Sequence, residues 1–128
     1  MKWDMAVNNM DRKKELKEQY KQMKTEMGIM IVQNKINNKY ILVPTQNLKG
    51  MINRVRFQLS SGGHPNRELQ TEWNEFGEGN FNFETLEVLE YDKDESKTDY
   101  SEELNIMEII WTEKLSDKKM EAYKKVRI

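Results

Sequence analysis

Two short apolar runs, at residues 28–32 and 40–43, flank a polar segment made mostly of asparagine and lysine. Both runs are rich in isoleucine and valine, whose branched side chains favour strands. Polar residues between two such runs are typical of a turn. The pattern therefore predicts a β-hairpin over residues 28–43, with Pro44 ending its second strand because proline lacks an N–H donor.

Helical spacing of apolar residues predicts two helices around this hairpin. The first runs from about Arg12 to Met27, capped by Asn9 or Asp11, with a stripe at Leu16, Tyr20, Met23 and Met27. The second starts at Thr45 or Asn47 and ends near Leu59. Its stripe is Leu48, Ile52, Val55 and Leu59.

The second half of the chain predicts a helix, a strand and two more helices. A short helix capped by Asn66 carries Leu69, Trp73 and Phe76 and ends at Gly77. A strand follows over about 81–88, with a bulge near Thr85 where the alternation shifts. The next helix starts at Asp99 or Ser101, and the last runs from Asp117 to about Lys125. The stripe of the former comprises Leu104, Met107, Glu108, Trp111 and Leu115.

This order of elements predicts an α+β fold. A small three-stranded antiparallel sheet is covered by helices, with one helix added at the N-terminus. The length of 128 residues suits one core. We expect a flexible leader at residues 1–10 and a single domain at 11–128.

Composition excludes several classes of site. The chain has no cysteine, which removes disulfides, thiolate zinc sites and cysteine nucleophiles. No apolar run approaches the length of a membrane span, and the first residues lack the apolar core of a secretory signal. We therefore expect a soluble, cytoplasmic protein that has no membrane partner.

Charge is segregated along the chain. Residues 28–67 hold six basic residues and no acid, whereas residues 68–113 hold fifteen acids and two lysines. If the basic residues share a face, that face can hold the phosphates of nucleic acid or of a nucleotide; if the fold interleaves the two halves, the charges cancel. The candidate phosphate-binding residues are Lys35, Lys39, Lys49, Arg54, Arg56 and Arg67.

Three segments carry a resemblance to a known family. The hairpin reads Gly28-Ile29-Met30 and, later, Ile41-Leu42-Val43, in the frame of a Gly-Ile-Tyr and a Tyr-Ile-Gly strand. A block over 64–81 has a His, a Leu-Gln pair, an aromatic residue and a Gly-x-x-Asn-Phe exit, and Glu108 stands three residues before Trp111. Together these segments resemble the GIY-YIG endonuclease family, as a degenerate member, over about residues 28–111. The resemblance implies a GIY-YIG-like fold.

The resemblance also implies a set of catalytic groups, most of which this sequence lacks. It implies that Glu108 binds Mg²⁺ or Mn²⁺ and that His64 belongs to the catalytic block. The two tyrosine positions fall on Met30 and Ile41, the arginine position on Met51 and another histidine position on Val55. Arg54 lies one helical turn after Met51 and can replace the missing arginine, whereas a strand directs Tyr40 to the opposite face from Ile41.

The candidate site is therefore Glu108, His64 and Arg54, with other interpretations open for each. Glu108 is either a metal ligand or a carboxylate at the edge of its stripe that is paired or reaches water; His64 and Arg54 are otherwise surface residues. The sequence favours a nucleic-acid-binding or nucleotide-phosphate-binding module with little or no cleavage activity. A divalent-metal-dependent endonuclease is one alternative. Another is a protein-interaction module whose acidic loop, residues 92–103, docks on a basic partner or mimics nucleic acid.

Overall fold

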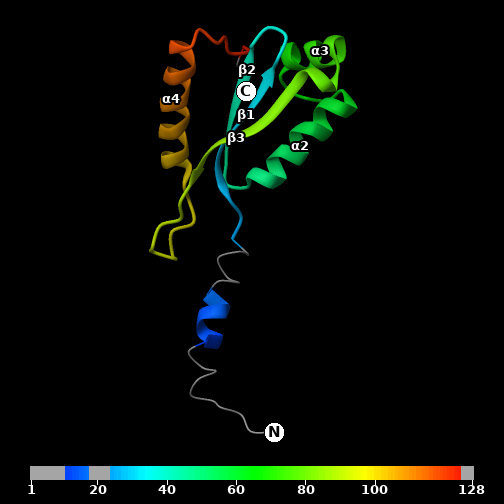
Figure 1. The fold of residues 1–128 in the computed structure, drawn as a ribbon. Helices are drawn as coiled ribbons and strands as arrows, with labels where there is room; N and C mark the ends of the chain where they lie inside the picture. The colour runs from blue at the N-terminus through cyan, green and yellow to red at the C-terminus, as the bar shows by residue number, and fades with distance from the viewer. Residues whose placement is uncertain (1–10, 18–23, 125–128) are drawn as a thin grey trace.

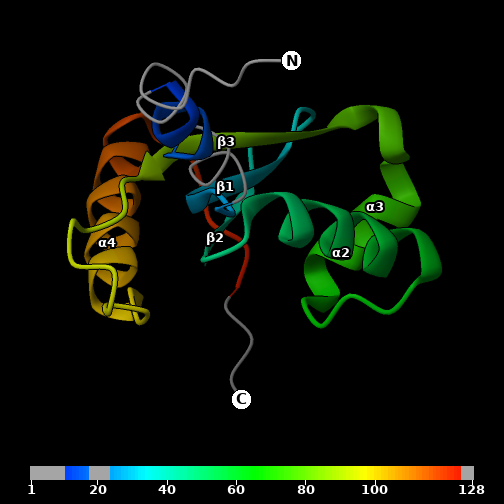
Figure 2. The same ribbon diagram turned by 90° about the horizontal axis from the view of Figure 1, so that it is seen from below.

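A three-stranded antiparallel sheet lies between two helical layers in the computed structural model of this chain (Figure 1). The structure describes residues 11–17 and 24–124. The strand order is β2 (Tyr40–Thr45), β1 (Met27–Asn34) and β3 (Phe81–Leu89), so β1 is central. Seen from below, helices α2 (Leu48–Ser61) and α3 (Arg67–Phe76) lie on one side of the sheet, and α4 (Ser101–Asp117) lies on the other (Figure 2). The predicted α+β class and the helix-covered sheet are confirmed.

The predicted hairpin is formed by β1 (Met27–Asn34) and β2 (Tyr40–Thr45). Pro44 lies inside β2, paired with Ile29, so the prediction that it ends the strand is wrong. The backbone N–H and C=O of Tyr40 bond to residues 121 and 123 and thus point away from β1. Pro44, four residues on, faces the same way, so its missing N–H removes no bond to β1.

Helices α2 (Leu48–Ser61) and α3 (Arg67–Phe76) begin and end as their cap residues predict. The Asn47 side chain accepts a hydrogen bond from Gly50 N, and the Asn66 side chain accepts one from Leu69 N. Gly62 ends α2 in the left-handed region, at φ 83°. A short 3₁₀ turn, η1 (Glu78–Asn80), then leads into β3.

Strand β3 (Phe81–Leu89) contains the predicted bulge. Ile29 pairs with Glu87, and the next residue, Met30, pairs with Thr85, so Leu86 is the extra residue. The shift allows Phe81 and Phe83 to pack on the α2 side of the sheet while Leu86 packs on the α4 side. The break in the sequence alternation therefore had a backbone cause.

Both terminal helix predictions need correction. Residues 11–17 are helical, but residues 18–23 lie outside the described part of the chain, and Met27 opens β1 instead of closing a helix. Helix α4 (Ser101–Asp117) extends through the start of the expected last helix. Lys119 then adopts φ 60° and turns the chain, and Ala122 forms a parallel bridge with Tyr40. The predicted leader, 1–10, also lies outside the described residues.

Alternation along β1 divides the core between the two faces of the sheet. Met30 and Val32 pack with α2, α3 and β3, in a cluster that includes Leu59, Leu69 and Trp73. On the other face, Met27 and Ile31 belong to two smaller clusters with α4, formed around Leu104 and Leu115. Burial of β1 on both faces explains why its sequence is almost continuously apolar.

Candidate functional site

A pocket of about 520 Å³ lies along β2, between α2 and α4. The strand contributes four consecutive residues to its lining, and α2, α4, the loop before α3 and the C-terminal segment contribute the rest. In Figure 2, β2 lies between these two helices. The pocket is lined by Tyr40, Ile41, Leu42, Val43, Met51, Arg54, Val55, Gln58, His64, Pro65, Asn66, Glu108, Thr112, Ala122 and Tyr123.

The three residues predicted as a catalytic group line this one pocket. Arg54 comes from α2, His64 from the loop that precedes α3, and Glu108 from α4. Arg54 is exposed, whereas His64 and Glu108 are half-buried. Residues separated by up to 54 positions in the sequence are therefore brought to one concave surface.

The rest of the pocket wall is largely apolar. Ile41, Val43 and Met51 pack against the same core cluster, and Val55 is a buried member of it. Ile41 occupies a position at which the resemblance implies a tyrosine, and Met51 occupies the position at which it implies an arginine. The other tyrosine position, Met30, is fully buried in the cluster and does not line the pocket. In this chain these positions serve packing.

Tyr40 does not replace the missing tyrosine. Its side chain is buried with Ile31 and Leu115 on the α4 side of the sheet, whereas Ile41 packs on the α2 side. Burial raises the pKa of the Tyr40 hydroxyl, so this phenol is a weaker acid than a solvated tyrosine and keeps its proton at neutral pH. The predicted opposite orientation of these two neighbours is confirmed.

His64 is held by its own loop. Its Nδ1 accepts a hydrogen bond from Asn66 N at 3.0 Å, and its backbone N–H donates to Gln70 Oε1 at 3.0 Å. The bond to Nδ1 places the proton of the neutral ring on Nε2. Burial lowers the pKa of His64. At neutral pH the ring is therefore an uncharged Nε2–H donor.

Glu108 stands at the edge of the α4 stripe. Leu104, Met107 and Leu115 face the core as predicted, but Glu108 is only half-buried and borders the pocket. Its backbone carbonyl accepts a hydrogen bond from Thr112 Oγ1 at 2.8 Å. Glu108 thus stands at the edge of the pocket and is not enclosed by the core.

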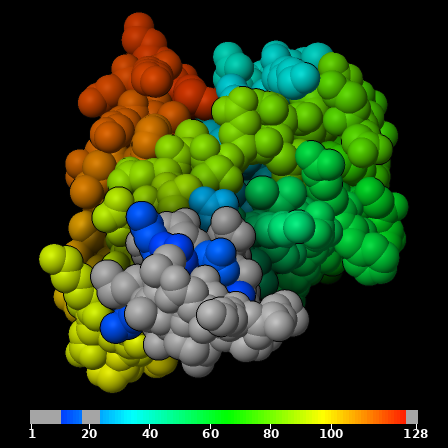
Figure 3. Space-filling view, turned by 60° about the horizontal axis from the view of Figure 1, so that its bottom comes forward, coloured from blue at the N-terminus to red at the C-terminus, as the bar shows by residue number. Residues whose placement is uncertain are grey.

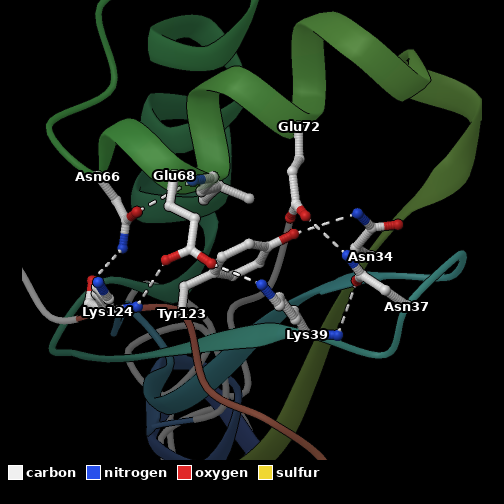
Figure 4. A network of polar contacts seen from close by, with 9 residues as sticks. Asn34, Asn37, Lys39, Asn66, Glu68, Glu72, Tyr123 and Lys124 are labelled. Atoms are coloured by element: carbon white, nitrogen blue, oxygen red, sulfur yellow. Dashed lines mark hydrogen bonds and ion pairs between the residues drawn. The ribbon is translucent and has the colours of Figure 1, made fainter.

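A polar network, which no sequence pattern indicated, fixes the C-terminal segment beside this pocket (Figure 4). Tyr123 is 2% exposed, and its hydroxyl accepts a hydrogen bond from Asn34 Nδ2 at 3.2 Å, with the Glu72 carboxylate close by. Burial and the neighbouring Glu72 raise the pKa of Tyr123. Asn66 Nδ2 donates to the Lys124 carbonyl at 2.9 Å. The predicted helix from Asp117 to about Lys125 gave no reason to expect that Tyr123 is buried.

The six candidate phosphate-binding residues do not gather in one place. Arg54 lines the β2 pocket, Lys49 lines a second pocket at the start of α2, and the Arg56 guanidinium lies 4.7 Å from the centre of the Phe83 ring. Lys39 forms a 2.7 Å ion pair with Glu68. Lys35 and Arg67 are exposed, in the hairpin turn and at the first position of α3.

The acidic loop is exposed, as predicted, but its carboxylates also shape it. Asp94 Oδ1 accepts hydrogen bonds from both N and Oγ of Ser96, and Asp99 does the same with Ser101. These bonds hold the pKa of each aspartate below its usual range. The loop (yellow in Figure 3) and residues 11–17 (blue) line one pocket of about 860 Å³.

Within residues 11–17 and 24–124, no cluster of three or more His, Asp or Glu side chains could hold a metal ion by itself. Glu108 is the one carboxylate among the residues of the β2 pocket. Magnesium is often held by one or two carboxylates together with water and substrate phosphates. These residues therefore fit a cation that is shared with a bound phosphate.

Among residues 11–17 and 24–124, no helix is both long enough and apolar enough to cross a membrane.

Comparisons with known proteins agree with this architecture. No protein-family model matches the sequence, and a search of curated proteins gave no significant match. The structure is similar to the catalytic domain of the homing endonuclease I-TevI, with a TM-score of 0.60 and 23% identity over 77% of this chain and 99% of that one. A glutamate-to-alanine mutant of that domain gives a TM-score of 0.60 and 22% identity, over 81% and 98%. The chain therefore has a GIY-YIG-like fold.

Proposed function

We propose that this protein is a single nucleic-acid-binding domain with a degenerate GIY-YIG active site and little or no nuclease activity. The fold likeness to an endonuclease catalytic domain supports nucleic acid as the ligand class. The observation that carries the loss of activity is the apolar wall of the β2 pocket. Ile41 and Met51, where the resemblance implies a tyrosine and an arginine, pack against the core cluster.

Efficient cleavage of a phosphodiester bond uses a group that activates water and a cation that stabilises the negative charge on the phosphate oxygens in the transition state. Removing a positioned base typically costs about 10²–10⁴ in rate. Removing one charge-stabilising donor costs about 10²–10³. Because Ile41 and Met51 are apolar, they can neither activate water nor stabilise this charge. We therefore expect little acceleration of cleavage from Glu108, His64 and Arg54 alone.

Phosphate binding requires less from the site. Arg54 supplies a guanidinium beside the pocket, and neutral His64 supplies an N–H donor. Both groups can hydrogen-bond phosphate oxygens. A nucleic-acid strand that follows the β2 pocket would meet these donors, and a nucleotide phosphate would meet the same chemistry on a smaller scale.

A divalent-metal-dependent endonuclease is the second candidate function. It is favoured by one observation, the presence of Glu108, Arg54 and His64 in the same pocket. In that case Mg²⁺ or Mn²⁺ would bind Glu108 together with a phosphate of the substrate, and Arg54 would stabilise the charge that develops during hydrolysis. The cation would supply charge neutralisation at the reacting phosphate.

Binding is tested by fluorescence anisotropy with labelled single-stranded and duplex oligonucleotides at low salt. Wild-type protein should bind, and affinity should fall steeply between about 50 and about 200 mM salt. Arg54→Ala should weaken binding and reduce the salt dependence by about one phosphate contact.

Lys93→Ala is the matched control, because Lys93 is an exposed cation in the acidic loop, outside the β2 pocket. It should leave affinity nearly unchanged. Absence of binding to any nucleic acid at low salt would refute the proposal. Equal losses in the two variants would refute the β2 pocket as the site.

A further inference from the structure

Helix α4 carries apolar residues on both of its sides. Leu104, Met107 and Leu115 are buried against the sheet. On the outer side, three isoleucines are exposed by 52%, 59% and 44%, at Ile106, Ile109 and Ile110. With about 100° of rotation per residue, these three lie within roughly one third of the helix circumference. A helix that is apolar on two sides is typical of one that is covered on two sides.

The folding of α4 does not account for these isoleucines. None of them belongs to a core cluster of the described chain. Isoleucine is a poorer helix former than alanine, lysine or glutamate, so helix propensity does not favour it on an exposed face. Single exposed apolar residues are ordinary, but adjacent ones mark interaction sites. The three isoleucines together therefore indicate a surface that a partner covers.

Acidic residues stand at the two ends of the isoleucine patch. Glu102 lies one turn before Ile106, and Glu113 lies one turn after Ile109. Both are exposed, and neither forms a salt bridge within residues 11–17 and 24–124. Glu103, by contrast, is paired with Lys97 at 2.6 Å. The charges at the ends of the patch thus remain available to a partner.

These charges disfavour a second copy of the chain as the partner of the isoleucine patch. In a parallel pair of α4 helices Glu102 would meet Glu102, and in an antiparallel pair centred on the patch it would meet Glu113. Either contact places like charges together, which is destabilising. The exposed cation beside Glu113, Lys114, lies 4.5 Å from the centre of the Trp111 ring and is engaged there. A partner with basic residues at both ends of an apolar stripe would be attracted instead.

We propose that the outer face of α4 binds an amphipathic helix of another protein, which has an apolar stripe and a basic residue near each end. Glu102 and Glu113 are eleven positions apart, which corresponds to about 16 Å along the helix axis. The partner's basic residues should therefore be separated by about three turns. Its stripe packs on the isoleucines and its two cations pair with the two glutamates.

The experiment uses a fluorescent synthetic peptide of that design, helical in solution, with leucines along one side and lysines near both ends. Anisotropy titration should show binding to the wild-type protein. Ile106→Gln with Ile109→Gln should weaken binding about tenfold or more. Glu102→Gln with Glu113→Gln should weaken it less and should remove much of its salt dependence. Circular dichroism melting checks that the variants fold.

Phe57→Gln is the matched control, since Phe57 is a 73% exposed apolar residue on α2. It should leave peptide affinity unchanged. The proposal is overturned if wild-type protein does not bind the peptide, or if a peptide with glutamates in place of the lysines binds equally well. It is also overturned if sedimentation detects a dimer that the isoleucine variant dissociates. DNA affinity should be the same in wild-type protein and in the Ile106→Gln, Ile109→Gln variant. The peptide experiment therefore tests this proposal independently of the nucleic-acid proposal.

Discussion

Lys39 Nζ lies 2.7 Å from Glu68 Oε1, and this ion pair joins the β1–β2 turn to α3. The other oxygen of Glu68 accepts a hydrogen bond from Lys124 N at 3.3 Å, so three distant segments meet at one carboxylate (Figure 4). The hydrogen bond between the partners raises the pKa of Lys39 and lowers that of Glu68. A lysine that the sequence suggested for phosphate binding is thus engaged within the protein.

Replacement of Lys39 should affect stability more than nucleic-acid binding. Ionised Glu68 stabilises the fold above its ordinary pKa of 4.5, and this contribution is lost as the pH falls through its lowered folded-state pKa. Lys39→Met should lower the melting temperature at pH 7 and flatten its decline below about pH 4.5. Lys35→Met, in the same turn but exposed, is the control and should change neither. A loss of DNA affinity equal to that of Arg54→Ala would contradict this interpretation.

Cleavage should be minimal. Because Ile41 and Met51 give the pocket an apolar wall, purified protein with Mg²⁺ or Mn²⁺ should cut plasmid DNA barely faster than Glu108→Ala. The measurement is the rate of nicking on agarose gels. Strong cutting that Glu108→Ala abolishes would establish the endonuclease alternative and refute the loss of activity.

His64 should titrate below pH 6.5. Burial lowers its pKa, so between the folded and unfolded values the unfolded chain binds more protons and stability decreases as the pH falls. Since His64 is the only histidine, its ring signals in NMR give this pKa directly. His64→Gln should reduce the decline in melting temperature between about pH 7 and pH 5. A folded-state pKa above that measured in urea would show that a nearby negative charge outweighs burial.

Tyr123→Phe should destabilise the protein by about 1–3 kcal/mol, because it leaves the buried Asn34 amide without its partner. Urea denaturation measures the change. Tyr91→Phe is the control, since the Tyr91 hydroxyl donates to the Thr25 carbonyl at an exposed site and should cost less. Equal effects would mean that burial of the Asn34–Tyr123 pair contributes little.

Gly28→Ala should cost about 1–3 kcal/mol or more, as overpacking does. A methyl group on Gly28 would overlap the Glu87 carbonyl oxygen on the neighbouring strand, beside the bulge. Gly79→Ala is the control, because no atom lies within 4 Å of the corresponding position there. Similar urea midpoints for the two variants would indicate that β3 can shift to make room.

Local signals predicted the central elements well. The hairpin, the Asn47 and Asn66 caps and the β3 bulge each follow from neighbouring residues, and each is present. The errors concern segments whose conformation is set by contacts with residues far away in the sequence. Residues 118–124 read as a helix but are drawn to the edge of β2 by bonds to Tyr40 and by burial of Tyr123.

For the candidate site, too, some residues could be predicted from the sequence and some contacts could not. The resemblance drew attention to Arg54, His64 and Glu108, and the structure places them in one pocket. Sequence spacing could not indicate that Lys39 pairs with Glu68 or that Arg56 lies over Phe83, because those partners are 29 and 27 positions away. The basic residues of 28–67 therefore could not be sorted, from the sequence alone, into those with a partner inside the protein and those without one.

The central position of β1 has a consequence for hydrogen exchange. Its amide hydrogens bond to strands on both sides, and its side chains are covered by helices on both faces. Amides in such a strand exchange with solvent only when the whole domain opens. Deuterium uptake at Ile29–Val32 should therefore report the global free energy of unfolding, whereas uptake in the acidic loop should report local opening. Measured in one sample, the two rates would separate variants that loosen the domain from those that alter only its surface.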